Sequence, residues 1–581
     1  MKNKIKMFLG TITSKLSTGI KRFPEAIFFA AATVVTLISI NHGDYNSNDV
    51  LERIAMILAL GIPASLCVKM LIEKTNGSIQ RRVIMMIGII GALVLYYMFL
   101  LQEINVVTSS RYIATTLALY LLFAVIPYCA RKNHFELYLV NLFTRFFVTY
   151  LYAFILFLGL AFTLFTINTL FNLDLTYKLY FDMWLIVVVI FAPAFFLADI
   201  PTFEENQEYD EYSKVLKVLI LYIVMPIIVV YTAILYAYFI KILFERSWPE
   251  GLVSHLVLWY SIVTSVVIVF VYPLRKSNKW VSGFTSYLPK VIMPVLLMMF
   301  ISMGIRISAY GITENRYFVI VSGIWVTLAM IHFILGKKTK NIHVVIALII
   351  IAAIAVYGPL SSYSVSKFSQ NARLEDLFTK YDMIQNGSIT EPSTEITQED
   401  KQHISSIIIY FNSRHDLHNI KFIPEDYTIE NIEEVLGFEL FYHWDAPYNP
   451  RDYFRYFTRE EGRIVDIETF DYLVEFPPHS FTNMEIDEEN MHVSFNNEER
   501  VLKVLIGNEE VYVKRMDDVV MNIIKDKGDK YELKSDEMMY VDEFDNITIK
   551  YLFNHISGYK DMSGDAVNID FIEFKVLIKT E

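Results

Sequence analysis

The chain has 581 residues, of which 54% are apolar and only 20% are charged, and its mean hydropathy is positive. This composition excludes a disordered, fibrous or wholly soluble protein. The net charge of −12 is unevenly distributed, because residues 1–360 hold 29 Lys and Arg against 18 Asp and Glu, whereas residues 361–581 hold 22 against 45. The sequence therefore predicts a membrane part followed by an acidic polar part.

Residues 1–22 are predicted to form an interfacial amphipathic helix. Apolar residues from Ile5 to Ile20 recur on one helical stripe, with lysines beside them. The segment lacks the short apolar core of a cleavable signal peptide. Pro24 then fits the first turn of the first apolar run, where its missing N–H costs nothing.

Residues 23–360 are predicted to form a transmembrane domain of about eleven α-helices, because a helix needs about 17 to 25 apolar residues to cross a bilayer. The expected spans lie near 23–40, 54–72, 83–101, 112–129, 146–170, 181–198, 218–240, 252–272, 291–309, 317–335 and 342–360.

Basic residues in the short loops predict the orientation of these spans. With the N-terminus in the cytoplasm, the cytoplasmic segments hold 22 Lys and Arg and the opposite segments hold seven. Lys and Arg near helix ends are retained on the cytoplasmic side. We therefore expect the N-terminus in the cytoplasm and residue 361 onward outside it.

The middles of the spans hold almost no ionisable side chains, which argues against a charged path through the membrane. Prolines do occur there, and we interpret them as helix kinks, with transporter-like helix breaks as the alternative. These prolines are Pro63, Pro127, Pro193, Pro226 and Pro294.

The polar part is predicted to begin with a stalk helix and linker over residues 361–396, whose apolar stripe includes Val365 and Phe368. An extracytoplasmic α+β domain with a mainly antiparallel sheet is expected over 397–581. Thr397 and Asp400 resemble a capping box, and a short helix from Ile429 is expected to end at Gly437. Further on, strands are expected near 439–444, 453–457, 464–476, 500–506, 510–515, 547–553 and 567–579, with a helix near 516–525 and bulges within 466–474 and 570–578.

Catalytic and metal-binding motifs are missing from the sequence. It has no glycine-rich phosphate loop, no His-Glu-x-x-His, no Gly-x-Ser-x-Gly and no Cys-x-x-Cys. His415 and His418 have a spacing that metal ligands use, but no third ligand accompanies them, so a solvated helix end is the simpler interpretation. We expect no catalytic residues, no metal, no cofactor and no nucleic-acid partner.

From Leu221 to Gln370 the chain resembles a bacterial membrane family, domain-of-unknown-function family 4153. The resemblance depends mainly on the run from Arg306 to Tyr317, which reads Arg-Ile-Ser-Ala-Tyr-Gly-Ile-Thr-Glu-Asn-Arg-Tyr. Trp248-Pro249-Glu250-Gly251 and Tyr272-Pro273-Leu274-Arg275 support it by order and spacing. The resemblance implies a polytopic envelope protein, which we expect in the bacterial cytoplasmic membrane, but no particular activity.

A candidate site follows from this motif and the predicted topology, which places a cluster of polar side chains at the outer membrane surface. Helix-end anchoring and a tight turn at Gly311 would explain them individually. As a cluster, we expect them to bind an anion, a lipid or the tail, with Glu314 orienting one guanidinium. The cluster consists of Trp248, Arg306, Tyr310, Glu314, Arg316 and Tyr317.

The function favoured by the sequence is that of a non-enzymatic envelope protein. Its membrane domain would lie in the lipid bilayer and anchor an acidic domain that recognises an envelope component. One alternative is a permease of an unknown solute that uses the proline-containing helices. A second alternative is an envelope glycan or lipid enzyme.

Overall fold

The computed structural model describes all residues except 1, 44–48, 76–77, 129–134, 174, 201–211, 246–251, 337–339, 386, 424–426, 439, 441–452, 459–466, 477–483, 489–490, 497–498, 508, 528–532, 535, 545–546, 561–566 and 581. The chain forms two compact units, Met1–Tyr442 and His443–Glu581. Residues 361–442, which the sequence analysis assigned to the stalk and tail, therefore pack with the unit that holds the apolar helices.

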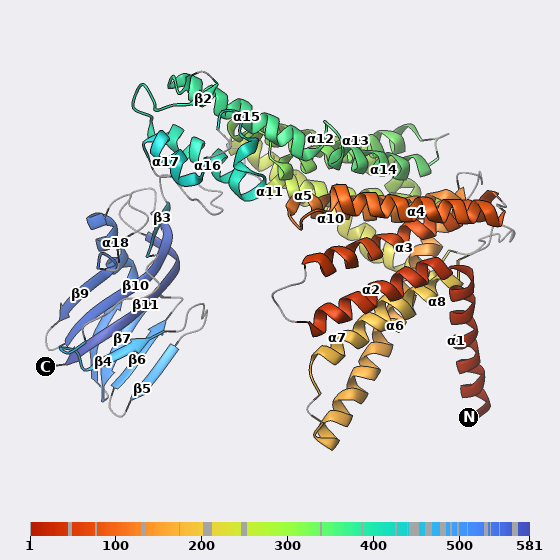
Figure 1. Cartoon of the computed structure of the whole chain (residues 1–581), viewed down its shortest axis with the longest axis horizontal. Helices are drawn as coiled ribbons and strands as arrows, with labels where there is room; N and C mark the ends of the chain where they lie inside the picture. Colours follow the sequence, from red (N-terminus) through yellow and green to blue (C-terminus); the bar gives the residue numbers. More distant parts are fainter. Residues whose placement is uncertain are drawn as a thin grey trace. The chain divides into compact units, whose positions relative to one another are not determined.

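The first unit is helical (Figure 1). Among the described residues, ten helical segments are long and apolar enough to cross a membrane, which confirms a multi-pass α-helical protein. Amphipathic α1 (Lys2–Arg22) precedes them. The spans are formed by α2 (Pro24–His42), α3 (Asp49–Thr75), α4 (Ile79–Leu100), α5 (Val106–Val125), α6 (Phe135–Phe171), α7 to α8 (Lys178–Ala198), α9 to α10 (Lys214–Glu245), α11 (Leu252–Val271), α12 (Lys279–Tyr310) and α13 (Glu314–Leu335).

The eleventh expected span is a shorter helix, α14 (Ile342–Val356), of 15 residues. At 1.5 Å per residue it is about 22 Å long, less than the roughly 30 Å of hydrocarbon. Its two ends nevertheless contact opposite ends of the bundle. Asn341 donates to Glu136 at the start of α6 (2.7 Å), and Val356 accepts from Arg111 in the first turns of α5 (3.3 Å).

The prolines of the spans do not interrupt the helices. Pro63 and Pro294 lie inside α3 and α12, and Pro127 lies in the short turn that ends the α5 segment. Pro193 and Pro226 each follow a π-helical turn, η2 (Ile186–Phe191) and η3 (Ile220–Val224), and the chain continues as α8 (Ala192–Ala198) and α10 (Met225–Glu245). A π-turn accommodates the backbone group that a proline cannot hydrogen-bond.

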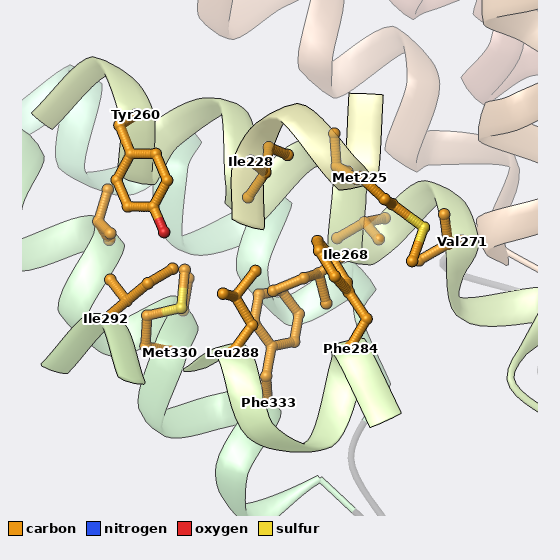
Figure 2. Packing of buried hydrophobic residues seen from close by; sticks show 14 of the residues in the cluster. Met225, Ile228, Tyr260, Ile268, Val271, Phe284, Leu288, Ile292, Met330 and Phe333 are labelled. Carbon is orange, nitrogen blue, oxygen red and sulfur yellow. The ribbon is translucent and has the colours of Figure 1, made fainter. Parts of the chain in front are cut away.

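The largest apolar core of the first unit lies between α10, α11, α12 and α13. Figure 2 shows Ile268, Phe284, Leu288 and Phe333 pointing toward one another from these helices. α12 and α13 run antiparallel, and a Cβ added at Gly323 would lie 2.4 Å from Met299 Cε. Small residues at such contacts let membrane helices approach closely, so Gly323 allows α13 to pack directly on α12.

Three further helices complete the first unit: α15 (Ser362–Lys380), α16 (Gln398–Arg414) and α17 (Ile429–Leu436). The short strands β1 (Ile384–Gln385) and β2 (Ser388–Ile389) form a hairpin between α15 and α16. The Thr397 hydroxyl accepts from Asp400 N, and Gly437 ends α17 at φ +71°, so the helix start and the helix end are confirmed. The reciprocal bond of a capping box is not formed, because Thr397 N donates to Tyr381 Oη.

The first half of the apolar stripe predicted for α15 is wrong, because Phe368 is 78% exposed, whereas its second half, Leu377, Tyr381 and Ile384, packs on an apolar core. The buried face instead carries Ser362, Ser366, Gln370 and Leu374. Gln370 of this face donates to the carbonyls of Tyr310 and Ile312 at the end of α12, so a hydrogen-bonding side chain takes the place of an apolar one there.

The second unit contains antiparallel sheets, as expected. In one sheet the strand order is β3 (Tyr453–Phe457), β10 (Ile547–Lys560), β11 (Val567–Thr580) and β4 (Tyr472–Glu475), and β9 (Met539–Phe544) also pairs with β10. The other sheet has the order β5 (Met484–Glu488), β6 (Met491–Asn496), β7 (Val501–Ile506) and β8 (Glu509–Arg515). Both sheets and α18 (Met516–Lys527) share one apolar core.

The β10–β11 ladder has two register shifts, one between Phe553 and His555 and one between Ser557 and Gly558. Ser557 pairs with Phe571 and Gly558 with Ile569, so Asp570 is left over on β11, which confirms the bulge predicted there. The bulge predicted within 466–474 is wrong in its described part, because Ile467 to Asp471 form turns before β4 begins. The strand expected near 439–444 lies almost entirely outside the described residues.

Candidate functional site

The α12–α13 turn, Gly311 to Thr313, is the centre of the candidate site. Gly311 has φ +69° and ψ −178°, a conformation that only glycine adopts without strain. A Cβ at this position would lie 2.7 Å from Arg373 Cδ and 2.8 Å from Gln370 Nε2. The missing side chain therefore allows both the sharp turn and the close approach of α15.

Helix α15 is held on this turn by polar contacts. Gln370 donates from Nε2 to the carbonyls of Tyr310 (3.1 Å) and Ile312 (3.0 Å), and Ser369 Oγ accepts from the Ile312 amide (2.9 Å). Arg373 Nη2 donates to the carbonyl of Ala309 (2.8 Å). These contacts satisfy backbone groups that the end of α12 leaves without helical partners.

A carboxylate, a phenol and an imidazole meet next to the turn. Glu314 Oε1 accepts from the Tyr410 hydroxyl (2.6 Å) and lies 2.7 Å from His415 Nε2, while Tyr410 Oη and His415 Nε2 are 2.9 Å apart. The side chains of His415 and Glu314 are only 4% and 12% exposed. The contact joins the first residue of α13 to α16.

The protons of this group follow from the distances. A bare Nε2 lone pair at 2.7 Å from a carboxylate oxygen would be repelled, so Nε2 of His415 carries a proton and donates it to Glu314. Burial raises the pKa of Tyr410, and the charge of Glu314 raises it further, so the phenol stays protonated and also donates. The Glu314 carboxylate therefore accepts two charge-assisted hydrogen bonds.

Three arginines surround the turn, and we call Arg306, Arg316 and Arg373 the arginine cluster. Arg316 Nη1 donates to the carbonyls of Tyr310 (3.0 Å) and Gly311 (2.8 Å), and its guanidinium lies 5.4 Å from the Tyr310 ring. The buried Nε of Arg306 has no hydrogen-bond partner in the part of the chain that the structure describes. Burial lowers the pKa of Arg373, because the site removes water from the charged group.

The structure brings together five of the six residues that the sequence singled out. Tyr317 donates to the carbonyl of Leu360 and so ties α13 to the segment before α15. Glu314 contacts His415 and Tyr410, so the expectation that it orients a guanidinium is not met by its described contacts. Trp248 lies outside the described residues.

Sequence reasoning missed the partners of the turn, Gln370, Arg373 and Tyr410, and gave His415 a different role. Gln370 lies on α15 and Tyr410 on α16, and for both helices the sequence analysis considered only the apolar residues. Within the described ranges, His, Cys, Asp and Glu form no group of three that could hold a metal ion.

The apolar helices and the polar cap at the end of α12 and α13 define a multi-pass membrane protein. A family described as a domain of unknown function, DUF4153, matches residues 26–391. The chain therefore belongs to the DUF4153 family, which confirms the resemblance predicted from the Arg306–Tyr317 motif.

One curated relative is an uncharacterized protein of Pasteurella multocida (strain Pm70). It is 24% identical over 381 residues, which are 64% of this chain and 62% of the relative. The match thus spans less than two thirds of that protein. No solved structure matches the chain.

Proposed function

We propose that the protein is a non-enzymatic anchor in the bacterial cytoplasmic membrane that holds an acidic recognition unit outside the cytoplasm. The membrane helices supply the anchor, and α15 to α17 form a platform that leads to the unit beginning at His443. An envelope component is the proposed partner of that unit, which carries 31 Asp and Glu against 16 Lys and Arg.

The observation that carries this proposal is the contact between Glu314 and His415. It joins the start of a membrane span to a helix that lies 101 positions later in the sequence. A flexible tether would need no such buried polar contact, whereas a positioned platform does. Removing a hydrogen-bond donor from a buried carboxylate leaves its charge less well compensated, so the contact opposes detachment of α16.

The loop charges support the proposed orientation. Basic residues on the proposed cytoplasmic side pair closely with acidic ones: Arg22 lies 2.8 Å from Glu73, and Lys15 lies 2.8 Å from Asp199. The opposite end has fewer basic residues and holds the α12–α13 turn with α15 and α16. On this topology the platform lies at the outer membrane surface.

Cysteine labelling of the full chain tests the orientation. Single cysteines replace exposed Ser388, Glu509 or Ser277 in a chain that lacks Cys67 and Cys129, and cells with an opened outer barrier receive a membrane-impermeant maleimide. We expect labelling at residues 388 and 509 before lysis. Residue 277 should react only after the cytoplasmic membrane is broken.

The opposite pattern, with residue 277 labelled in intact cells and residues 388 and 509 protected, would contradict the proposal. Labelling of all three positions after lysis is the internal control, because it shows that each cysteine is reachable in the folded protein. The test needs no knowledge of the partner.

A permease is the second candidate, and the π-turns before Pro193 and Pro226 favour it. Such turns are frequent at functional sites of helices. Vesicles with the full chain would then take up a solute, and Pro226→Ala or Pro294→Ala would abolish the uptake. The continuity of these helices is the reason that we prefer the anchor.

An enzyme using Glu314, Tyr410 and His415 is less well supported. General acid and base groups must reach the atoms on which they act. The 4% exposure of the His415 side chain instead favours a structural role.

A further inference from the structure

The arginine cluster combines three positive charges from three different elements. Arg306 belongs to α12, Arg316 to α13 and Arg373 to α15. Arg316 and Arg373 both lie against Gly311, because Arg316 donates to its carbonyl and Arg373 Cδ lies 2.7 Å from where its Cβ would be. Arg306 lies one turn before Tyr310, whose ring and carbonyl contact Arg316. Like charges at half-buried positions repel one another strongly unless an opposite charge compensates them.

No described carboxylate compensates this charge. The nearest candidate, Glu314, is engaged by His415 and Tyr410, and none of the three arginines forms an ion pair within the described residues. The carbonyl end of α12 supplies only about half a negative charge, which Arg316 and Arg373 already share. An excess of about two and a half positive charges remains.

The cluster also has unused hydrogen-bond donors. Each guanidinium has five N–H groups, and the described contacts use one nitrogen of Arg316, one of Arg373 and none of Arg306. The fork of a guanidinium matches the oxygen atoms of a phosphate. The missing counter-charge and the free donors together describe a site for a phosphate group.

The surface next to the cluster indicates that this phosphate belongs to a lipid. Ile301 and Ile305 lie one turn apart on α12 and are 42% and 46% exposed, and Tyr310 at the helix end is 43% exposed. The exposed apolar stripe of Ile301 and Ile305 ends beside Arg306, the next residue of α12, whereas Tyr310 lies on the other side of the helix. The end of a spanning helix, where arginine and tyrosine occur, lies at the depth of the lipid headgroups. A free phosphate ion would gain nothing from the stripe.

We propose that Arg306, Arg316 and Arg373 bind the phosphate of an anionic phospholipid headgroup, while its acyl chains lie along Ile301 and Ile305. Because Arg373 comes from α15, the bound headgroup fastens the platform to the α12–α13 turn. The site itself does not depend on which side of the membrane this end faces or on the anchor function.

Native mass spectrometry of the full-length chain released from detergent tests this site. The added ligands are phosphatidylglycerol, phosphatidylcholine and inorganic phosphate. The first two both contain a phosphate, but the choline group cancels its charge. We expect one phosphatidylglycerol molecule bound about tenfold more tightly than phosphatidylcholine, since one charge-assisted contact supplies a factor of this size.

Arg306→Gln is the informative variant, because Arg306 has no described partner to lose. It should reduce the tenfold preference to about twofold, with Arg306→Lys in between. Arg111→Gln is the matched control, since Arg111 lies at the same end of the bundle and donates to the backbone carbonyl of Val356. It should keep the preference.

Two results would overturn the proposal. An equal preference for phosphatidylglycerol in wild type, Arg306→Gln and Arg111→Gln would return the arginines to the role of helix-end anchors. Binding of inorganic phosphate that needs Arg306 and resists competition by phosphatidylglycerol would identify a soluble anion as the ligand and refute the lipid.

Discussion

Nε2 of His415 lies 2.7 Å from Oε1 of Glu314, although the two residues are 101 positions apart. Glu314 is the first residue of α13, and His415 directly follows α16. Each side chain alone would be a costly buried polar group, but together with Tyr410 they satisfy one another. This contact fixes α16, which follows the last apolar helix α14, to the helical unit.

Loss of His415 should loosen α16. His415→Ala leaves the Glu314 carboxylate buried with Tyr410 as its remaining described partner, so we expect the free energy of local opening to fall by about 3 kcal/mol. Tyr410→Phe, which removes one hydroxyl, should cost about 1 kcal/mol. Hydrogen exchange of the α16 amides between Ile404 and Phe411 in the full chain measures both effects.

The matched control for this change is His418→Ala. The His418 side chain is 46% exposed and lies 3.8 Å from Asp416, so its loss should change α16 exchange by less than about 0.5 kcal/mol. Equal exchange in the His415 and His418 variants would show that the Glu314 contact does not hold α16.

Gly311→Ala should destabilise the α12–α13 turn. The substitution places a Cβ in a glycine-only conformation and within 2.8 Å of Arg373 and Gln370 atoms, so we expect a cost of about 2 kcal/mol. Gly304→Ala in the same helix has open space around its Cβ and should be neutral or slightly stabilising. Thermal unfolding of both variants checks the prediction, and equal melting temperatures would contradict it.

Acid should weaken the start of α16 through Asp400. Burial would raise the pKa of Asp400, but hydrogen bonds from Lys380, Tyr381 and Thr397 outweigh it and lower the pKa below 3.8. A lowered carboxyl pKa contributes stability above the unfolded value, which is lost as pH falls below about 4. After correction for the intrinsic exchange rate at each pH, the protection of the amides at the start of α16 should therefore fall below about pH 4.

Asp400→Asn should remove this loss of stability at acid pH, which we call the acid step. The amides of the variant should be less protected than those of wild type at pH 7 and lose no further protection below about pH 4. Glu375→Gln, in an exposed pair with Lys421, is the control and should keep the wild-type profile. An unchanged acid step in Asp400→Asn would assign the step to another group.

Gly19→Val should separate α1 from α8. A Cβ at Gly19 would lie 2.0 Å from the carbonyl oxygen of Ala194, and Lys15 pairs with Asp199 next to this contact. Overpacking of this kind costs about 1 to 3 kcal/mol. Trypsin should cleave faster after Lys21, whereas Gly10→Val, with open space at its Cβ, should leave the rate unchanged.

The apolar helices and several local signals could be predicted from the sequence because they depend on neighbouring residues. Hydropathy located all eleven segments, and Thr397 and Gly437 marked the ends of α16 and α17 correctly. The π-turns before Pro193 and Pro226 could not be predicted, since periodicity does not distinguish them from α-helix.

Strands β5, β6 and β9 were not predicted from the sequence, and for β5 and β9 the cause is local. β5 and β9 contain Glu485, Asp487, Asp542 and Glu543, which disfavour strands in a single-sequence view. Pairing overrides this preference, because β9 lies beside β10 and Tyr512 and Lys514 both bind Asp542 (2.6 and 2.9 Å). Tertiary contacts therefore decided these elements.

The candidate site could be located from the sequence but its contacts could not. The motif from Arg306 to Tyr317 identified the correct turn. The choice of His415 as the partner of Glu314 depends on how α15 and α16 fold back onto the turn, and no local pattern encodes that path. An acidic residue at a helix start and a histidine at a helix end are each ordinary.

A double-mutant cycle on Glu314 and His415 tests the central claim most directly. Local opening free energies of α16 are measured by hydrogen exchange in wild type, Glu314→Gln, His415→Ala and the double variant. The account predicts that the double variant costs less than the sum of the single variants by at least about 1 kcal/mol. Additivity within about 0.3 kcal/mol would show that the two residues do not interact and that α16 is not held on the turn by this contact.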